Sequence, residues 1–82
     1  MHIDEYFKDM ISRIRSTARD MKRCIGLPVE VNVEDGGGYV TIVCGGEILI
    51  ADCTEYVEGS VQDMLSGMKF YKKIMKKEKR NV

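Results

Sequence analysis

The middle of the chain alternates apolar and polar residues, whereas the segments on either side repeat apolar residues every three or four positions. Alternation is typical of a strand with one buried face, and glycine-rich segments separate three such runs. We therefore predict an antiparallel meander with strands at residues 29–34, 39–44 and 47–52. Gly45-Gly46 fits a two-residue hairpin turn, and residues 35–38 fit a four-residue loop.

The flanking segments have the spacing of helices that bury one side. We predict the first helix at residues 3–25, with Asp4 as its N-cap and Gly26 just beyond its end. The second is predicted at residues 54–77 and is followed by a basic tail at residues 78–82. The whole chain, 1–82, is thus predicted to be a single α+β domain with the order helix, strand, strand, strand, helix.

Two apolar residues of the second helix, Phe70 and Ile74, lie off its main apolar stripe. They are either the edge of a wide buried face or part of a docking patch. The first interpretation is favoured, because a chain of 82 residues has few apolar residues to spare from its core.

Turn lengths determine which residues of neighbouring strands face each other, and opposed residues share a face of the sheet. The four-residue loop predicts that Val31 opposes Ile42, and the two-residue turn predicts that Ile42 opposes Leu49. The buried face is then predicted to hold Val29, Val31, Val33, Val40, Ile42, Cys44, Leu49 and Ala51. The opposite face is predicted to hold Glu30, Asn32, Glu34, Tyr39, Thr41, Val43, Ile48, Ile50 and Asp52.

The second face contains an apolar strip. Whether this strip is exposed or covered depends on where the helices pack. If both helices cover the buried face, the strip is exposed as a contact surface for a protein partner or for a second copy of the chain. If one helix wraps around the sheet, the strip is covered instead. The residues concerned are Tyr39, Val43, Ile48 and Ile50.

The formal net charge is +0, but the charges are separated along the chain. Residues 26–63 contain eight acidic residues and no Lys or Arg, whereas residues 64–82 contain seven basic residues and one acidic residue. Cations suit the end of a helix, but this number exceeds that need and suggests contact with nucleic acid or an acidic protein. The cluster contains Lys69, Lys72, Lys73, Lys76 and Lys77. A basic row on the first helix, either solvated or in contact with phosphates, contains Lys8, Arg15, Arg19 and Lys22.

The residue types that carry enzyme chemistry are sparse or badly placed. His2 is the only histidine and stands at the end of the chain, and the three cysteines lack the spacing of a zinc site. The Gly36-Gly37-Gly38 run leads into a strand and not into a helix, so it does not fit a phosphate loop. We predict a non-enzymatic protein without a metal or cofactor. Because no apolar run has the length of a membrane helix or a signal peptide, we expect a cytoplasmic location.

The element order resembles that of the double-stranded-RNA-binding domain. That family carries a lysine cluster at the start of its second helix, where it meets phosphates. The corresponding stretch here, from Asp52 to Asp63, reads D-C-T-E-Y-V-E-G-S-V-Q-D and is acidic. The resemblance therefore does not extend to the residues that bind duplex RNA.

The element order, the short length and the I-L-I-A-D-C-T-E junction also resemble small phage-encoded inhibitors, notably one group of type II anti-CRISPR proteins. Such inhibitors are non-enzymatic and use acidic sheet edges and loops to occupy a nucleic-acid site on an effector nuclease. This resemblance implies a partner that handles nucleic acid and contact through Glu30, Glu34, Asp35, Glu47, Asp52 and Glu55.

Two functional hypotheses follow from these observations. In the first, the chain is a small interaction protein that binds a nucleic-acid-handling protein through its acidic sheet. In the second, it is a nucleic-acid-binding module that uses the basic row and the C-terminal lysines.

Overall fold

The computed structural model describes the backbone of residues 2–80 and the side chains of residues 2–77. It consists of α1 (Glu5–Ile25), β1 (Val29–Glu34), a short helical turn η1 (Asp35–Gly37), β2 (Tyr39–Cys44), β3 (Glu47–Cys53) and α2 (Thr54–Arg80). The three strands form one antiparallel sheet in the order β1-β2-β3, which confirms the predicted α+β fold. Residues 78–80 of the predicted basic tail continue α2, and residues 81–82 lie outside the described part.

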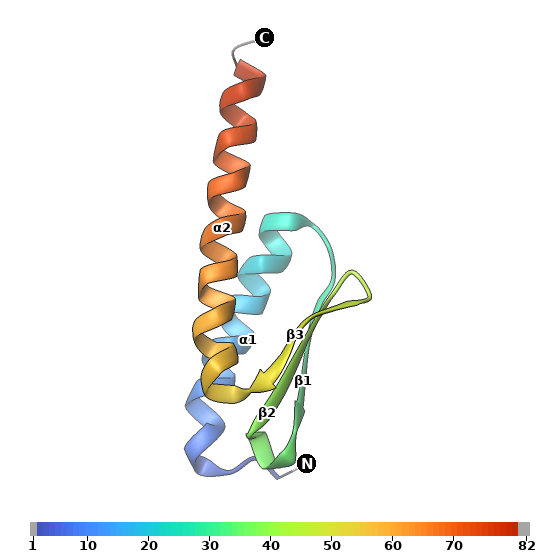
Figure 1. Cartoon of the computed structure of the whole chain (residues 1–82), viewed down its shortest axis with the longest axis vertical. Coiled ribbons are helices and arrows are strands. Elements are labelled where there is room, and N and C mark those ends of the chain that lie inside the picture. The colour runs from blue at the N-terminus through green and yellow to red at the C-terminus, as the bar shows by residue number, and fades with distance from the viewer. Residues whose placement is uncertain (1, 81–82) are drawn as a thin grey trace.

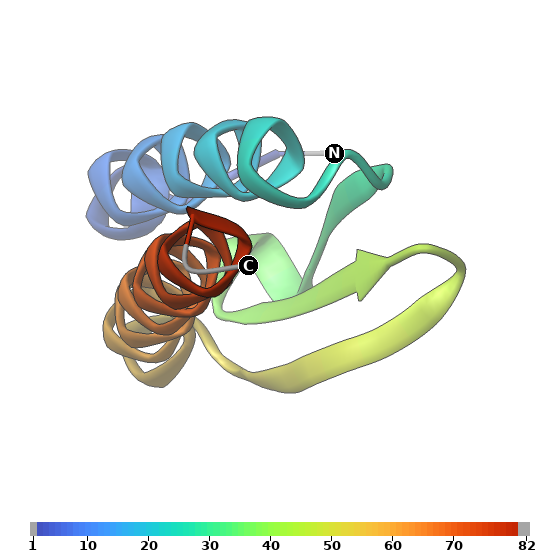
Figure 2. The ribbon, with the colours of Figure 1, turned by 90° about the horizontal axis from the view of Figure 1, so that it is seen from above.

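Both helices pack against the same face of the sheet. α1 lies along β1 and α2 lies along β3 and β2, and Figure 2 shows the two helices together on one side. The buried core between the layers contains Ile14, Met21, Val40, Ile42, Val57 and Val61. The opposite face of the sheet is therefore left without a covering helix, which answers the question that the sequence left open.

The pairing of β1 with β2 has the predicted register, and so do the two β2–β3 pairs beside the hairpin turn, but the predicted β2–β3 pairing is wrong from Ile42 back to Tyr39. Val43 opposes Ile48, yet Ile42 opposes Ile50 in place of Leu49. The register shift between Ile42 and Val43 is a β-bulge that leaves Leu49 as the extra residue. The bulge reverses the two faces of β3 from Ile50 onward.

Four predicted positions change as a result, and the first is Leu49, which was predicted to be buried but is 40% exposed. Ile50 packs against the core and not on the outer strip, and Asp52 opposes buried Val40. Ala51 opposes Thr41 on the uncovered face, so it is not a core residue. Ile50 thus takes the place opposite Ile42 that was predicted for Leu49, and Asp52 takes the place opposite Val40 that was predicted for Ala51.

The η1 turn, which connects β1 to β2, is hydrogen-bonded to the residues at the starts of both helices. Asp4 holds the N-cap position of α1, but its side chain makes no capping hydrogen bond; its backbone N–H donates to the Gly36 carbonyl at 2.7 Å. The hydroxyl of buried Thr54 donates to the Gly37 carbonyl, and the Thr54 N–H donates to the Gly38 carbonyl at 3.1 Å. Hydrogen bonds thus join the starts of α1 and α2, which are far apart in sequence, to the same short turn.

The second half of α2 extends beyond the rest of the molecule. Figure 1 shows its last turns rising past the end of α1 and past the β2–β3 hairpin. The Cα trace measures 52 × 22 × 16 Å, so the molecule is a two-layer body with a helical extension. Among the described side chains of this extension, Phe70, Tyr71, Ile74 and Met75 are each at least 38% exposed.

Candidate functional site

The outer face, the side of the sheet that neither helix covers, carries exposed apolar residues. Val43 and Ile48 lie opposite each other on it, and Ile48 is 69% exposed. Tyr39 stands on the same face and is 39% exposed. Of the four residues expected in the apolar strip, Ile50 lies on the other side. Strand alternation and the observed register place on this face Glu30, Asn32, Glu34, Tyr39, Thr41, Val43, Ile48, Ala51 and Cys53.

The six acidic residues do not form a single cluster: Glu30 and Glu34 lie on the outer face, whereas Glu47 and Asp52 oppose residues of the helix-covered face. Glu30 and Glu34 stand on the edge strand β1, opposite Val43 and Tyr39 respectively. Glu47 begins β3 beside the hairpin turn, where it opposes Cys44. The other three are exposed at the loop and helix end of the sheet: Asp35, Asp52 and Glu55.

The α1 basic row (Lys8, Arg15, Arg19 and Lys22) lines two shallow hollows on the side of α1 next to β1. One hollow, of about 220 Å³, is bounded by Lys8, Arg15 and Arg19. The other, of about 300 Å³, is bounded by Arg15, Arg19 and Lys22 together with β1. The row is therefore placed along a groove with polar walls, which is compatible with a bound anion.

A second basic surface combines α2 with the end of α1. Arg23 meets four of the predicted lysines around a hollow of about 400 Å³; these are Lys69, Lys72, Lys73 and Lys76. The fifth, Lys77, is exposed but does not line the hollow. Lys72 Nζ donates to the Cys24 carbonyl at 3.3 Å, as suits a cation at the C-terminus of α1. Arg23 was missed because its position beside α2 depends on helix packing.

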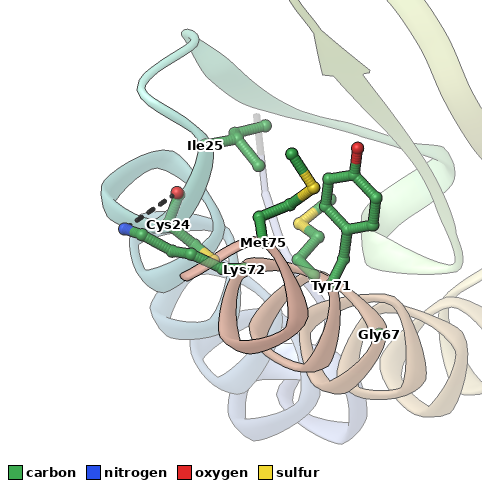
Figure 3. Close-up of a pocket in the computed structure, with 7 residues that line it drawn as sticks. Cys24, Ile25, Gly67, Tyr71, Lys72 and Met75 are labelled. Carbon is green, nitrogen blue, oxygen red and sulfur yellow. Dashed lines mark hydrogen bonds between the residues drawn. The ribbon is translucent and has the colours of Figure 1, made fainter. Parts of the chain in front are cut away.

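An apolar hollow of about 550 Å³ lies between the end of α1 and the extension of α2. Figure 3 shows Tyr71 and Met75 pointing into it from α2, with Ile25 on the opposite wall. Tyr71 is 65% exposed. Phe70 is also 65% exposed and Ile74 is 40% exposed, so the interpretation of these two as the edge of a buried face is wrong.

One ion pair joins the two helices. Arg13 Nε donates to Glu58 Oε1 at 2.5 Å, from α1 to α2. This hydrogen bond raises the pKa of Arg13 above its ordinary value, and the charges of Glu58 and Asp9 add to the effect. Arg13 is charged at any physiological pH, so the pair contributes to helix packing and not to a pH-dependent reaction.

Among residues 2–77, no group of three or more His, Cys, Asp or Glu side chains is arranged to hold a metal ion. None of the described helices combines the length and the apolar character needed to cross a membrane. Comparison with models of known protein families, with curated proteins and with solved structures finds no match. Any functional conclusion therefore depends on the surfaces themselves.

Proposed function

We propose that the chain is a small protein-binding module that docks through the outer face of its sheet onto a protein that handles nucleic acid. The observation that supports this most directly is the packing of both helices on one face. It leaves the paired side chains of Val43 and Ile48 on the uncovered face, with Glu30 directly opposite Val43 on β1.

The chemistry of the face specifies the kind of partner. Glu30 and Glu34 stand on the outer face, Glu30 directly opposite Val43, and no Lys or Arg occurs between residues 26 and 63. A surface with an apolar centre and an anionic border complements one with an apolar centre and a cationic border. Cationic borders of that kind are common on proteins that bind the phosphate backbone. An inhibitor from a mobile genetic element, of the type that the sequence resembles, would use the face in this way.

Capture from a native host lysate, with and without nuclease, tests the proposal. We expect Ile48→Asp to reduce recovery of a nuclease-resistant protein partner at least tenfold, because a charge replaces an apolar group at the centre of the contact. Ser16→Asp adds the same charge on an exposed site of α1 and should leave recovery unchanged. Captured proteins are identified and quantified by mass spectrometry.

Charge reversal separates the two charged surfaces. Combined Glu30→Lys and Glu34→Lys substitutions should abolish capture, and combined Lys73→Glu and Lys76→Glu substitutions should not. If the variant with Lys73→Glu and Lys76→Glu loses the partner while the variant with the Glu→Lys substitutions keeps it, the contact lies on α2 and the proposal is wrong. Circular dichroism establishes that each variant is folded.

A second candidate function, nucleic-acid binding, is favoured by one specific observation. Arg23 of α1 and the lysines of α2 converge on the same hollow, although they are 46 or more positions apart in the chain. When cations from two elements lie around one hollow, a single phosphate can contact more than one of them. A row of cations on one solvated helix face does not offer this.

This candidate predicts a steep dependence of affinity on salt. With five cations at the hollow, the slope of log K against log salt concentration should be about −3 to −4 for single-stranded nucleic acid. Arg23→Gln should reduce the slope by about 0.7, because one phosphate contact is lost. Fluorescence anisotropy with a labelled oligonucleotide measures both. A slope near zero would exclude nucleic acid as the ligand of this surface.

A further inference from the structure

The extension of α2 has an apolar side that nothing in the described chain covers. Phe70, Tyr71, Ile74 and Met75 are each at least 38% exposed. α1 and the sheet pack against α2. Even so, Tyr56 in the first half of α2 is 59% exposed. Large apolar side chains are thus exposed near both ends of one helix.

Tyr56, Phe70 and Ile74 belong to one seam along α2. Helical positions spaced alternately by four and three residues form such a stripe; the ends of this one are apolar and its middle is small or polar. Five seam residues are exposed and Ser60 is half-buried. The α2 seam contains Tyr56, Ser60, Asp63, Gly67, Phe70 and Ile74. It spans about 27 Å of helix.

We propose that the α2 seam is the interface of a homodimer in which α2 packs antiparallel against α2 of a second copy. In the register that places Tyr56 opposite Ile74, Ser60 lies opposite Phe70 and Asp63 lies opposite Gly67. Each large residue of the extension then meets either another large residue or a small one. A Cβ on Gly67 would have no neighbour within 4 Å in the single chain, so the site has space for a second helix.

The charges of α2 favour the antiparallel direction. Its first half carries Glu55, Glu58 and Asp63 without a cation, whereas residues 69–77 carry five lysines without an anion. Glu58 is already paired with Arg13, whereas Glu55 has no ion-pair partner among the described side chains. In the register above, Glu55 lies level with Met75 of the second copy, between Lys73 and Lys77. A parallel pair would instead bring the two lysine clusters together, which is unfavourable.

The dimer does not use the outer face of the sheet, so it extends the function proposed above and does not depend on it. Two copies joined along α2 each keep an outer face free. A partner with repeated sites would therefore bind the dimer more tightly than a single copy, through effective concentration.

Sedimentation equilibrium of the full chain over a concentration series tests the proposal. We expect a concentration-dependent mass that reaches twice 9.3 kDa. Ile74→Asp should raise the dissociation constant about a hundredfold, because it places a charge in each half of the interface. Ile48→Asp is the matched control on the outer face and should leave the constant unchanged. Both residues are exposed, so circular dichroism of the two variants should match the parent.

A charge exchange tests the antiparallel register. Glu55→Lys should raise the dissociation constant about tenfold, since both copies gain a repulsive contact, and adding Lys73→Glu and Lys77→Glu should restore it. Failure of the exchange to restore dimerisation would overturn the register.

Three other results would overturn the dimer itself. The first is a monomer at every concentration, and the second is a loss of mass in Ile48→Asp but not in Ile74→Asp. The third is a monomer whose extension binds vesicles containing phosphatidylserine, which would assign the apolar side to a membrane surface.

Discussion

Gly37→Ala is expected to reduce the free energy of unfolding by about 3–4 kcal/mol, from steric overlap together with backbone strain. Gly37 has a φ of 103°, in the region that favours glycine. A Cβ there would lie 2.9 Å from Phe7 Cβ and 3.0 Å from Ile3 Cγ2. Relief would require α1 to move away from η1, which would break the hydrogen bonds of the turn. Urea denaturation followed by circular dichroism measures the change.

Gly46→Ala is the matched control for this change. Gly46 also has a positive φ, 86°, but a Cβ there would meet nothing within 4 Å. Its replacement should cost about 1 kcal/mol, from backbone strain alone. Equal losses in the two variants would show that the close approach of α1 to η1 is not a constraint on the fold.

Ile42→Ala is expected to reduce the free energy of unfolding by about 3–4 kcal/mol, through lost burial and an unfilled cavity. Ile42 is 0% exposed and lies in the core with Ile14 and Met21. A domain of this size is stabilised by roughly 4–12 kcal/mol in total, so a large part of the population should unfold at elevated temperature. Thermal and urea unfolding both report the loss.

Ile48→Ala makes the same chemical change on the outer face. Because Ile48 is 69% exposed, we expect its replacement to alter stability by less than about 0.5 kcal/mol. A comparable loss in Ile48→Ala would mean that the outer face is covered in solution, for example by a second copy. The two variants therefore report the contribution of the core to the free energy of unfolding and whether the outer face is exposed in solution.

The element order and the β1–β2 register could be predicted because polar residues alternate strictly with Val29, Val31 and Val33. The β2–β3 register could not. Residues 48–51 are apolar at every position, so either face of β3 satisfies a binary pattern, and the bulge at Leu49 depends on the volume available in the core. A one-residue error there moved Ile50 to the wrong face.

The charged surfaces could be predicted from the sequence, but the residues that lie beside them in the fold could not. Separation of the acidic and basic residues along the chain is a property of composition, whereas the meeting of Arg23 with α2 depends on how two helices cross. The exposure of Phe70 and Tyr71 follows from element lengths. A helix of 27 residues spans about 40 Å and a strand of six spans about 20 Å, so α2 outruns the sheet.

The extension of α2 also separates positive from negative charge although the net charge of the chain is zero. Asp35, Asp52 and Glu55 lie at the end of the sheet that is far from the α2 lysines, in a molecule that is 52 Å long. A charged partner would pull these ends in opposite directions and rotate the molecule before contact. Ions screen such a torque beyond about 8 Å at physiological ionic strength, so the alignment acts in the last step of the encounter. The separated charges thus select which end of the molecule arrives first.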